Sequence, residues 1–301
     1  MRRRAWLAAP LLLLPGRRAL ARDLPAPPGA LPLPGLPRSA SWIARTPRQP
    51  EARHRILLAW PEGPPPATGW PLLYLLDGEA SFPMAVTAMR RPGAALRPAL
   101  LVGLGYPAAA PLDPGGRDRD YTPPAAGAPE GFGGAEPFLE FLRQELQPEL
   151  ARHHPLNPER LAMFGHSYGG LCLLHAFFTR PDWLWGGIAA SPSIGWQQGA
   201  LLETAHAFLA APPPGTARRR LLITAGSEEE PALDSPMVSP ERRERVRQSR
   251  MVSRARAMTE ALAGLGAAAP QVEFRLFEGE SHGSVVGPAL RAGLRYLYGS
   301  A

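Results

Sequence analysis

Residues 160–172 have the sequence RLAMFGHSYGGLC, and the fold of the chain is decided there. A short apolar run meets the pattern Gly-x-Ser-x-Gly, centred on Ser167, and an apolar stretch without helix breakers follows it. This order predicts a strand, a sharp turn and a helix. Gly165 and Gly169 fit such a turn because the projected serine has a strained backbone, and only hydrogen side chains clear the adjacent strand and helix. Ser167 would lie at the helix N-terminus, which favours developing negative charge; a simple helix cap is its alternative role.

Similar apolar runs alternate with helical patterns on both sides of this unit. Further strands are predicted at 54–60, 72–76, 99–105, 187–190, 220–225 and 272–277, and helices at 81–90, 136–153 and 285–298. Strands that alternate with helices need crossover connections, so we expect an α/β fold with a mostly parallel central sheet flanked by helices. The polar excursion 107–134 interrupts the pattern, and its length is typical of a functional loop, a lid or a disordered segment.

The charged residues exclude some classes of partner. The chain of 301 residues has a formal net charge of +7, but five arginines lie within the first eighteen residues, so the rest is nearly neutral. Lysine is absent, which indicates a compositional bias toward arginine rather than a surface for phosphate contacts. Nucleic acid is therefore not an expected partner, and no membrane span is expected. The single cysteine, Cys172, excludes an intrachain disulfide and is expected to be a buried packing residue.

Three segments are expected along the chain. Residues 1–21 combine N-terminal arginines, an apolar run and Ala19-Leu20-Ala21, which is the order of a cleavable secretory signal, and Arg3-Arg4 resembles a twin-arginine leader. This predicts a periplasmic or secreted protein, with an uncleaved cytoplasmic N-terminus as the alternative. Residues 22–38 are rich in proline and alanine and are expected to be a disordered or surface-lying arm. Residues 39–301 would form the α/β domain.

Chemistry is expected at one edge of the sheet. In an open parallel sheet, ligands collect beyond the carboxyl ends of the strands. Ser167, the glutamates of 228–230 and His282 each follow the carboxyl end of a different predicted strand, so they are expected to converge. A serine hydroxyl is a poor nucleophile without a base. His282 is favoured among seven histidines because it lies in a short loop between the last strand and the last helix.

The order of serine, acid and histidine along the chain is typical of α/β-hydrolases. The candidates for the acid that orients His282 are Glu228, Glu229, Glu230 and Asp234. Glu229 is favoured, but three consecutive glutamates leave the register open. An oxyanion hole needs two preorganised donors. These would be the backbone N–H groups of Tyr168, next to the nucleophile, and of Glu79, in the turn after the strand 72–76.

Five short motifs carry a resemblance to a known family. In chain order they are Leu75-Leu76-Asp77-Gly78, Arg117-x-x-Asp120-Tyr121-Thr122-Pro123, Gly165-His166-Ser167-Tyr168-Gly169-Gly170, Ser191-Pro192-Ser193 and Glu280-Ser281-His282-Gly283. Over residues 40–298 the chain resembles the esterase D-like α/β-hydrolases, particularly the periplasmic and cytosolic esterases that open trilactone catecholate siderophores such as enterobactin and salmochelin. Some of these siderophore esterases use a Ser–His dyad, which leaves the need for an acid open.

The resemblance implies a function that the residues alone do not specify. It implies the α/β-hydrolase fold and a serine esterase that hydrolyses lactone bonds of a catecholate siderophore through an acyl-enzyme. Neither a metal nor another cofactor is expected, and the expected partner is a small-molecule ester bound by a monomer. Arg117 and Arg119 would pair with catecholate oxygens or an acidic acyl group, or else form a solvated basic loop.

Other functions fit the same pattern less closely. A general carboxylesterase or an acyltransferase would use the same fold and the same three residues. A siderophore-binding protein without catalytic activity is a third alternative, which the presence of nucleophile, base and donor turns argues against.

Overall fold

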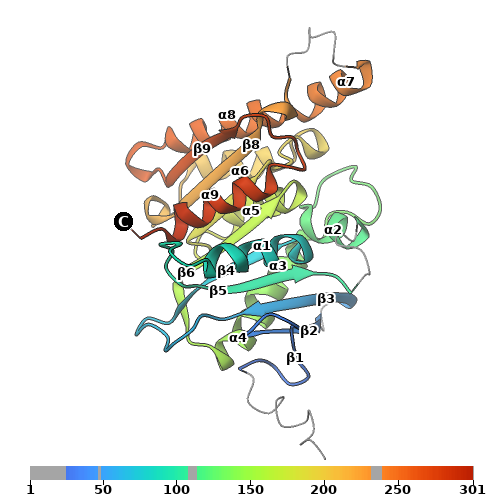
Figure 1. Ribbon diagram of the computed structural model, residues 1–301. Coiled ribbons are helices and arrows are strands. Elements are labelled where there is room, and N and C mark those ends of the chain that lie inside the picture. The colour runs from blue at the N-terminus through green and yellow to red at the C-terminus, as the bar shows by residue number, and fades with distance from the viewer. Residues whose placement is uncertain (1–24, 47–48, 108–113, 232–238, 301) are drawn as a thin grey trace, which may run out of the picture.

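The computed structural model describes residues 25–46, 49–107, 114–231 and 239–300 (Figure 1). The predicted leader, residues 1–21, and the candidate acid Asp234 lie outside these ranges. Within them, no helix combines the length and the apolar character that a membrane span requires.

A single sheet runs through the molecule. Its nine strands in the described ranges are β1 (Leu31–Pro32), β2 (Ser39–Thr46), β3 (Gln49–Ala59), β4 (Trp70–Leu76), β5 (Leu100–Gly105), β6 (Leu156–His166), β7 (Gly186–Ala190), β8 (Arg220–Gly226) and β9 (Gln271–Phe277). They lie in the order β1-β2-β3-β5-β4-β6-β7-β8-β9. The pairs from β1 to β5 in this order are antiparallel, and all later pairs are parallel. The predicted α/β fold is confirmed, and β9 lies at an edge as its alternating sequence predicts.

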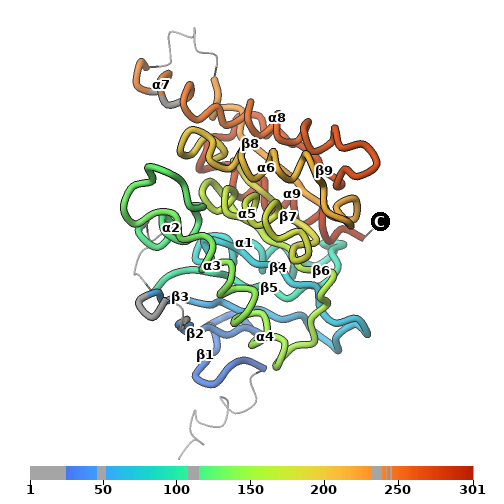
Figure 2. Tube along the Cα trace, turned by 180° about the vertical axis from the view of Figure 1, so that it is seen from behind, coloured from blue at the N-terminus to red at the C-terminus, as the bar shows by residue number. Residues whose placement is uncertain are grey.

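Helices cover both faces of the sheet. They are α1 (Gly78–Arg90), α2 (Pro114–Tyr121), α3 (Ala135–Phe141), α4 (Gln147–His153), α5 (Tyr168–Thr179), α6 (Leu201–Ala210), α7 (Pro240–Ser249), α8 (Met251–Ala263) and α9 (Val286–Tyr298). Helices α1 and α9 pack on one face, and α3 to α6 with α8 pack on the other (Figures 1 and 2). Helix α7 lies at the periphery, where it projects from the end of the molecule next to α8.

The central strands are buried on both sides. Along β4, Leu72, Tyr74 and Leu76 pack into one hydrophobic cluster, while Leu73 and Leu75 pack into the cluster on the opposite face. This explains why the strand sequences are continuous apolar runs rather than alternating ones. The rigid sheet fixes the positions of the loops at its carboxyl edge.

Residues 136–153, predicted as one helix, contain an irregularity. A π-helical segment, Leu142–Leu146, connects α3 and α4, and Pro148 lies in the first turn of α4. Proline has no N–H group and its ring crowds the carbonyl one turn earlier, so a wider turn before it lets the helix continue.

Two segments without sequence periodicity are more ordered than the sequence indicates. Within the excursion 107–134, residues 114–121 form α2, and the side chains of Asp120, Tyr121 and Thr122 are buried. In the arm, Ala26 and Ala30 are buried and Leu31–Pro32 pairs with β2, so the described part of this arm lies on the domain. Both segments are ordered by contacts with residues distant in the sequence, and a local sequence pattern does not reveal such contacts.

Candidate active site

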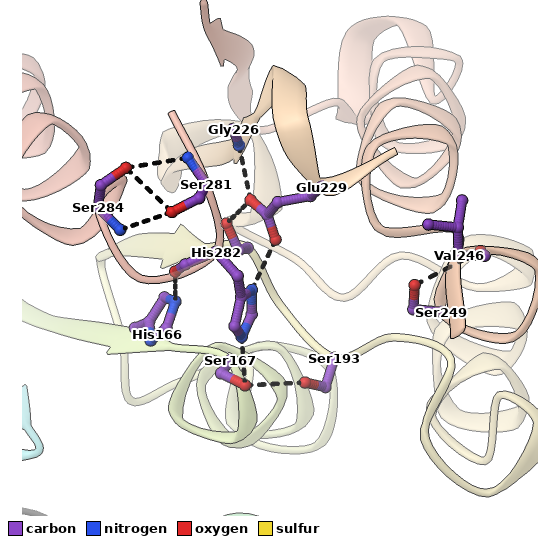
Figure 3. A network of polar contacts seen from close by, with 11 residues as sticks. His166, Ser167, Ser193, Gly226, Glu229, Val246, Ser249, Ser281, His282 and Ser284 are labelled. Carbon is purple, nitrogen blue, oxygen red and sulfur yellow. Dashed lines mark hydrogen bonds and ion pairs between the residues drawn. The ribbon is translucent and has the colours of Figure 1, made fainter. Parts of the chain in front are cut away.

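Three loops at the carboxyl edge of the parallel strands bring together the residues predicted for catalysis (Figure 3). Ser167 follows β6, Glu229 ends a short turn of 3-10 helix after β8, and His282 lies between β9 and α9. In the sheet, only β7 separates β6 from β8, and β9 pairs with β8. Side chains that are far apart in the sequence therefore meet at one place.

Ser167 lies on a strained turn. Its backbone has φ 59° and ψ −117°, a conformation that costs a residue other than glycine of order 1–3 kcal/mol. A Cβ atom on Gly165 would lie 2.1 Å from the carbonyl oxygen of Gly169, so the turn requires glycine there. The prediction that Gly169 must also be glycine is wrong, because a Cβ atom on Gly169 would make an ordinary contact of 3.4 Å with Leu76. The second tight position is Gly170, whose Cβ would lie 3.0 Å from Pro192.

His282 connects the serine to the acid. Its Nε2 lies 3.1 Å from Ser167 Oγ, and its Nδ1 lies 2.6 Å from Glu229 Oε2. A carboxylate only accepts hydrogen bonds, so Nδ1 carries the proton and the Nε2 lone pair faces the serine hydroxyl. This tautomer can remove a proton from Ser167.

Glu229 is the member of the glutamate run that reaches His282. The neighbouring Glu230 instead accepts hydrogen bonds from the backbone N–H of Ser253, at 2.7 Å, and from its hydroxyl. Glu229 Oε1 accepts hydrogen bonds from Ser191 Oγ at 2.5 Å and from the Gly226 N–H at 2.6 Å. Burial alone would raise the pKa of Glu229, but the hydrogen bonds from His282, Ser191 and Gly226 outweigh it and hold the pKa below its usual range. The carboxylate is thus ionised and fixed in orientation.

His166 supports the histidine loop from the other side. Its Nε2 donates a hydrogen bond of 2.8 Å to the backbone oxygen of His282, and the two rings lie 4.5 Å apart between centroids. Burial, followed by repulsion from His282, lowers the pKa of His166 to about 4. His166 is therefore a neutral donor at physiological pH, and it contacts the His282 loop rather than the Ser167 hydroxyl.

The backbone donors predicted for an oxyanion hole lie in the first turns of two helices. Tyr168 begins α5 and Glu79 is the second residue of α1, and such N–H groups have no acceptor one turn earlier in their own helix. β4, which leads to Glu79, pairs with β6, which leads to Ser167. Burial raises the pKa of the Glu79 carboxyl, and backbone N–H groups partly offset this rise.

The two arginines predicted for substrate binding are held by carboxylates. Arg117 Nε lies 2.5 Å from Asp77 Oδ1, with the side chains only 14% and 9% exposed. Arg119 Nε lies 2.7 Å from Asp120 Oδ1. The guanidinium carbon of Arg117 also lies 5.6 Å from the centroid of the Tyr121 ring.

Several residues at the site were not assigned a role from the sequence. Ser193 Oγ lies 3.2 Å from Ser167 Oγ. Phe132 stacks on Trp196 with ring centroids 6.3 Å apart and meets the edge of Tyr168 at 6.2 Å, so three separate segments contribute an aromatic cluster. The signal for Ser191 and Ser193 was available, because both follow β7, which lies between the strands that carry Ser167 and Glu229. No signal indicated Phe132, because it lies in the excursion without periodicity.

A comparison with known families identifies the class of protein. Residues 49–262 match the family described as "Putative esterase". The chain belongs to this esterase family. The esterase is thus a carboxylic ester hydrolase with the α/β-hydrolase fold that the resemblance implies.

Two curated relatives and one solved structure show where the esterase lies within that family. It is 33% identical to the ferri-bacillibactin esterase BesA of Bacillus subtilis (strain 168) over 264 residues, which cover 83% of this esterase and 86% of the relative. It is also 33% identical to the siderophore enterobactin esterase of Emericella nidulans over 247 residues, which cover 75% and 81% of the two chains. The structure of the siderophore hydrolase EstB from Aspergillus nidulans superposes with a TM-score of 0.77 at 27% identity and covers 89% of the esterase and 97% of that chain.

Proposed function

We propose that this protein is a serine esterase that hydrolyses the lactone bonds of a catecholate siderophore through an acyl-enzyme. The observation that carries the mechanism is the hydrogen-bonded series from Ser167 Oγ through the His282 ring to Glu229, with distances of 3.1 Å and 2.6 Å. A nucleophile, a base and a group that orients the base are the parts that acyl transfer requires.

In the first half of the reaction, Ser167 Oγ forms a bond to the ester carbonyl carbon while His282 Nε2 takes the hydroxyl proton. Glu229 stabilises the resulting imidazolium. The carbonyl oxygen becomes an oxyanion, which the N–H groups of Tyr168 and Glu79 would stabilise by about 3 kcal/mol each. The intermediate collapses, the bond from carbon to the alcohol oxygen breaks, and His282 returns its proton to the leaving alcohol.

Water completes the reaction by the same steps. His282 removes a proton from water as the water oxygen bonds to the acyl carbon. Collapse releases the carboxylic acid, and the proton returns to Ser167 Oγ. In each half-reaction the Nε2 lone pair of His282 accepts the proton of the attacking oxygen.

The proposed substrate class is supported by the relatives and by the surface around Ser167. Both curated relatives named above are siderophore esterases. The aromatic cluster of Phe132, Tyr168 and Trp196 offers ring faces to aromatic acyl groups. A pocket of about 470 Å³ beside His282, lined in part by Val246 and Met251, provides room for a further part of a large substrate.

Arg117 and Arg119 are retained as candidate contacts for negative charge on the substrate. Arg117 is the better placed because it binds Asp77, whose Oδ2 would lie 3.7 Å from a Cβ atom on Gly169, two residues after Ser167. Export to the periplasm or medium, from the sequence of residues 1–21, fits a substrate that is met outside the cytoplasm and belongs to the same proposal.

Comparing substrates across variants tests the function. The wild-type protein is incubated with enterobactin-type trilactones and with p-nitrophenyl butyrate, and kcat/KM is compared for Ser167→Ala and His282→Ala. We expect a burst of alcohol release, a higher kcat/KM for the trilactone, and a loss of at least about 10³-fold in both variants.

Each alternative has its own outcome in this experiment. Wild-type activity in Ser167→Ala contradicts the serine mechanism. A trilactone that is hydrolysed no better than the aryl ester indicates a general carboxylesterase. An added alcohol that captures the acyl group in preference to water indicates an acyltransferase, and tight binding of ferric siderophore without hydrolysis indicates a binding protein.

A further inference from the structure

The turn between β4 and α1 contains a strained residue. Asp77 has φ 52° and ψ 54°, a left-handed conformation that is costly for a residue with a side chain unless its surroundings over-determine it. All of its polar groups are engaged. Its carbonyl oxygen accepts from the N–H groups of Ala80 and Ser81, each at 3.0 Å. The strain is therefore maintained by neighbouring groups, and these neighbours decide where Gly78 and Glu79 lie.

The backbone N–H of Asp77 is held by a side chain from α2. It donates a hydrogen bond of 3.0 Å to Tyr121 Oη, and Tyr121 is fully buried. Arg117, one turn earlier in α2, binds both carboxylate oxygens of Asp77 with Nε and Nη2, at 2.5 Å and 3.2 Å. Side chains of α2 thus hydrogen-bond both the backbone and the carboxylate of Asp77.

A buried polar chain lies behind Tyr121. The rings of Tyr121 and Tyr106 lie 6.3 Å apart between centroids. Tyr106 Oη donates to Asp120 Oδ2 at 2.9 Å, and His54 Nε2 lies 2.9 Å from the same oxygen. All four side chains are buried. These hydrogen bonds hold Asp120, the neighbour of Tyr121 in α2, and so help to fix the position of the hydroxyl that faces Asp77.

The turn that contains Asp77 lies close to Ser167. A Cβ atom placed on Gly169, two residues after Ser167, would lie 3.7 Å from Asp77 Oδ2. A shift of the turn would therefore change its distance to Ser167. Oxyanion donors act only when they lie about 3 Å from the position that the developing charge will occupy.

We propose that Tyr121 is a positioning residue for the reaction, because its hydroxyl fixes the turn Asp77–Glu79 that supplies the second oxyanion donor. This inference rests on the proposed serine mechanism. It gives a role to the motif Arg117-x-x-Asp120-Tyr121, whose tyrosine and carboxylate do not touch the reacting atoms. Without the hydroxyl, the Asp77 N–H would be buried without an acceptor, and the turn would relax toward other partners.

Tyr121→Phe tests the inference directly. The ring of Tyr121 packs against Phe138 with centroids 5.6 Å apart, and phenylalanine keeps that contact. We expect kcat for p-nitrophenyl butyrate to fall about 10- to 100-fold with KM nearly unchanged. The affinity for a trifluoromethyl ketone, which forms a tetrahedral adduct with a reactive serine, should fall by the same factor as kcat/KM.

The matched control is Tyr74→Phe. Tyr74 is also fully buried and lies on β4, but its hydroxyl donates to the carbonyl of Leu142 at 3.4 Å, away from the turn. Its removal should leave kcat within about twofold of wild type. Tyr106→Phe removes a hydrogen bond to Asp120, the neighbour of Tyr121 in α2, so it provides a second measurement if Tyr121→Phe does not fold.

The outcomes separate this inference from the function on which it rests. If Ser167→Ala is inactive and Tyr121→Phe is as active as Tyr74→Phe, the positioning role is wrong and the serine mechanism stands. If Tyr121→Phe loses kcat and affinity for the ketone together while its melting temperature matches that of Tyr74→Phe, the positioning role is supported. Full activity in Ser167→Ala contradicts the proposed function and this inference with it.

Discussion

Ser191 Oγ lies 2.5 Å from Glu229 Oε1, so the carboxylate that faces His282 is itself held from behind. Ser191 is completely buried and has φ 43°, and its backbone N–H donates a hydrogen bond of 2.8 Å to the carbonyl of Thr224 on β8. The Gly226 N–H donates to the same oxygen. Two donors on one oxygen leave the other free to bind the imidazole.

Ser191→Ala should weaken this arrangement. Loss of one hydrogen bond to a charged group costs about 1.5–3 kcal/mol, and we expect kcat/KM to fall about 10-fold because Glu229 is less well ionised and oriented. The measurement is kcat/KM from pH 4 to 8. Ser253→Ala is the control, since it removes a hydroxyl that hydrogen-bonds the neighbouring Glu230, which does not reach His282. Equal rates in the two variants would contradict the role given to Ser191.

His166→Phe should reduce the rate without moving its dependence on pH. The pKa of His166 is about 4, so the ring is a neutral donor to the His282 carbonyl throughout the range from pH 5 to 8. Its removal frees the His282 loop, and we expect kcat to fall about 10-fold. His166→Gln restores an N–H donor and should recover part of the loss. A shift of the acidic limb in His166→Phe would show that His166 itself titrates in the reaction.

The two glycines of the serine turn should differ in their tolerance of alanine. Gly165→Ala places a Cβ atom 2.1 Å from the Gly169 carbonyl oxygen, and the clash should cost about 3 kcal/mol of the free energy of unfolding. Gly169→Ala has room, and alanine is favoured in a helix, so its stability should stay within about 1 kcal/mol of wild type. Urea unfolding measures both. A Gly169→Ala protein as unstable as Gly165→Ala would refute the geometry described for the turn.

Glu136→Gln should destabilise the protein above pH 4.5 and less so in acid. The hydrogen bond from His175, opposed by burial and aided by Arg180, lowers the pKa of Glu136 from 4.5 to about 2. A lowered carboxyl pKa contributes stability above the unfolded value, and that stability is lost as the pH falls through the folded value. We expect a difference of about 1 kcal/mol or less at pH 7, because Glu136 is 41% exposed.

The control for Glu136 is Glu203→Gln. Glu203 is exposed on α6 and should show little difference from wild type at any pH. Melting temperatures of the three proteins from pH 2.5 to 7 provide the comparison. A Glu136→Gln difference that grows toward low pH would contradict the direction of the shift.

The central part of the site follows from the sequence because it depends on topology. Apolar runs that end in Ser167 and in the loop of His282 predict two parallel strands, and the carboxyl ends of parallel strands share one edge. The two side chains meet there for that reason, without any local signal linking them.

The finer parts of the site depend on contacts that a single sequence does not display. Glu229 was one of three consecutive glutamates, and the register is set by the turn after Gly226, whose N–H binds the carboxylate. Helix α2 was expected to be a loop, because its polar sequence is ordered by distant partners: Asp120 hydrogen-bonds His54 on β3, and Tyr121 hydrogen-bonds Asp77 in the turn after β4. Ser193 and Phe132 reach the site through loops whose course follows from packing rather than from periodicity.

His282, the base of the proposed reaction, follows β9, which is the most exposed of the parallel strands. Every residue of β9 is partly or fully exposed, whereas six of the seven residues of β8 are buried. Outer strands open at a lower free energy than the core that supports them. Moderate heating should therefore separate His282 from Ser167 and abolish activity at a temperature below that of global unfolding. Cooling should restore the activity.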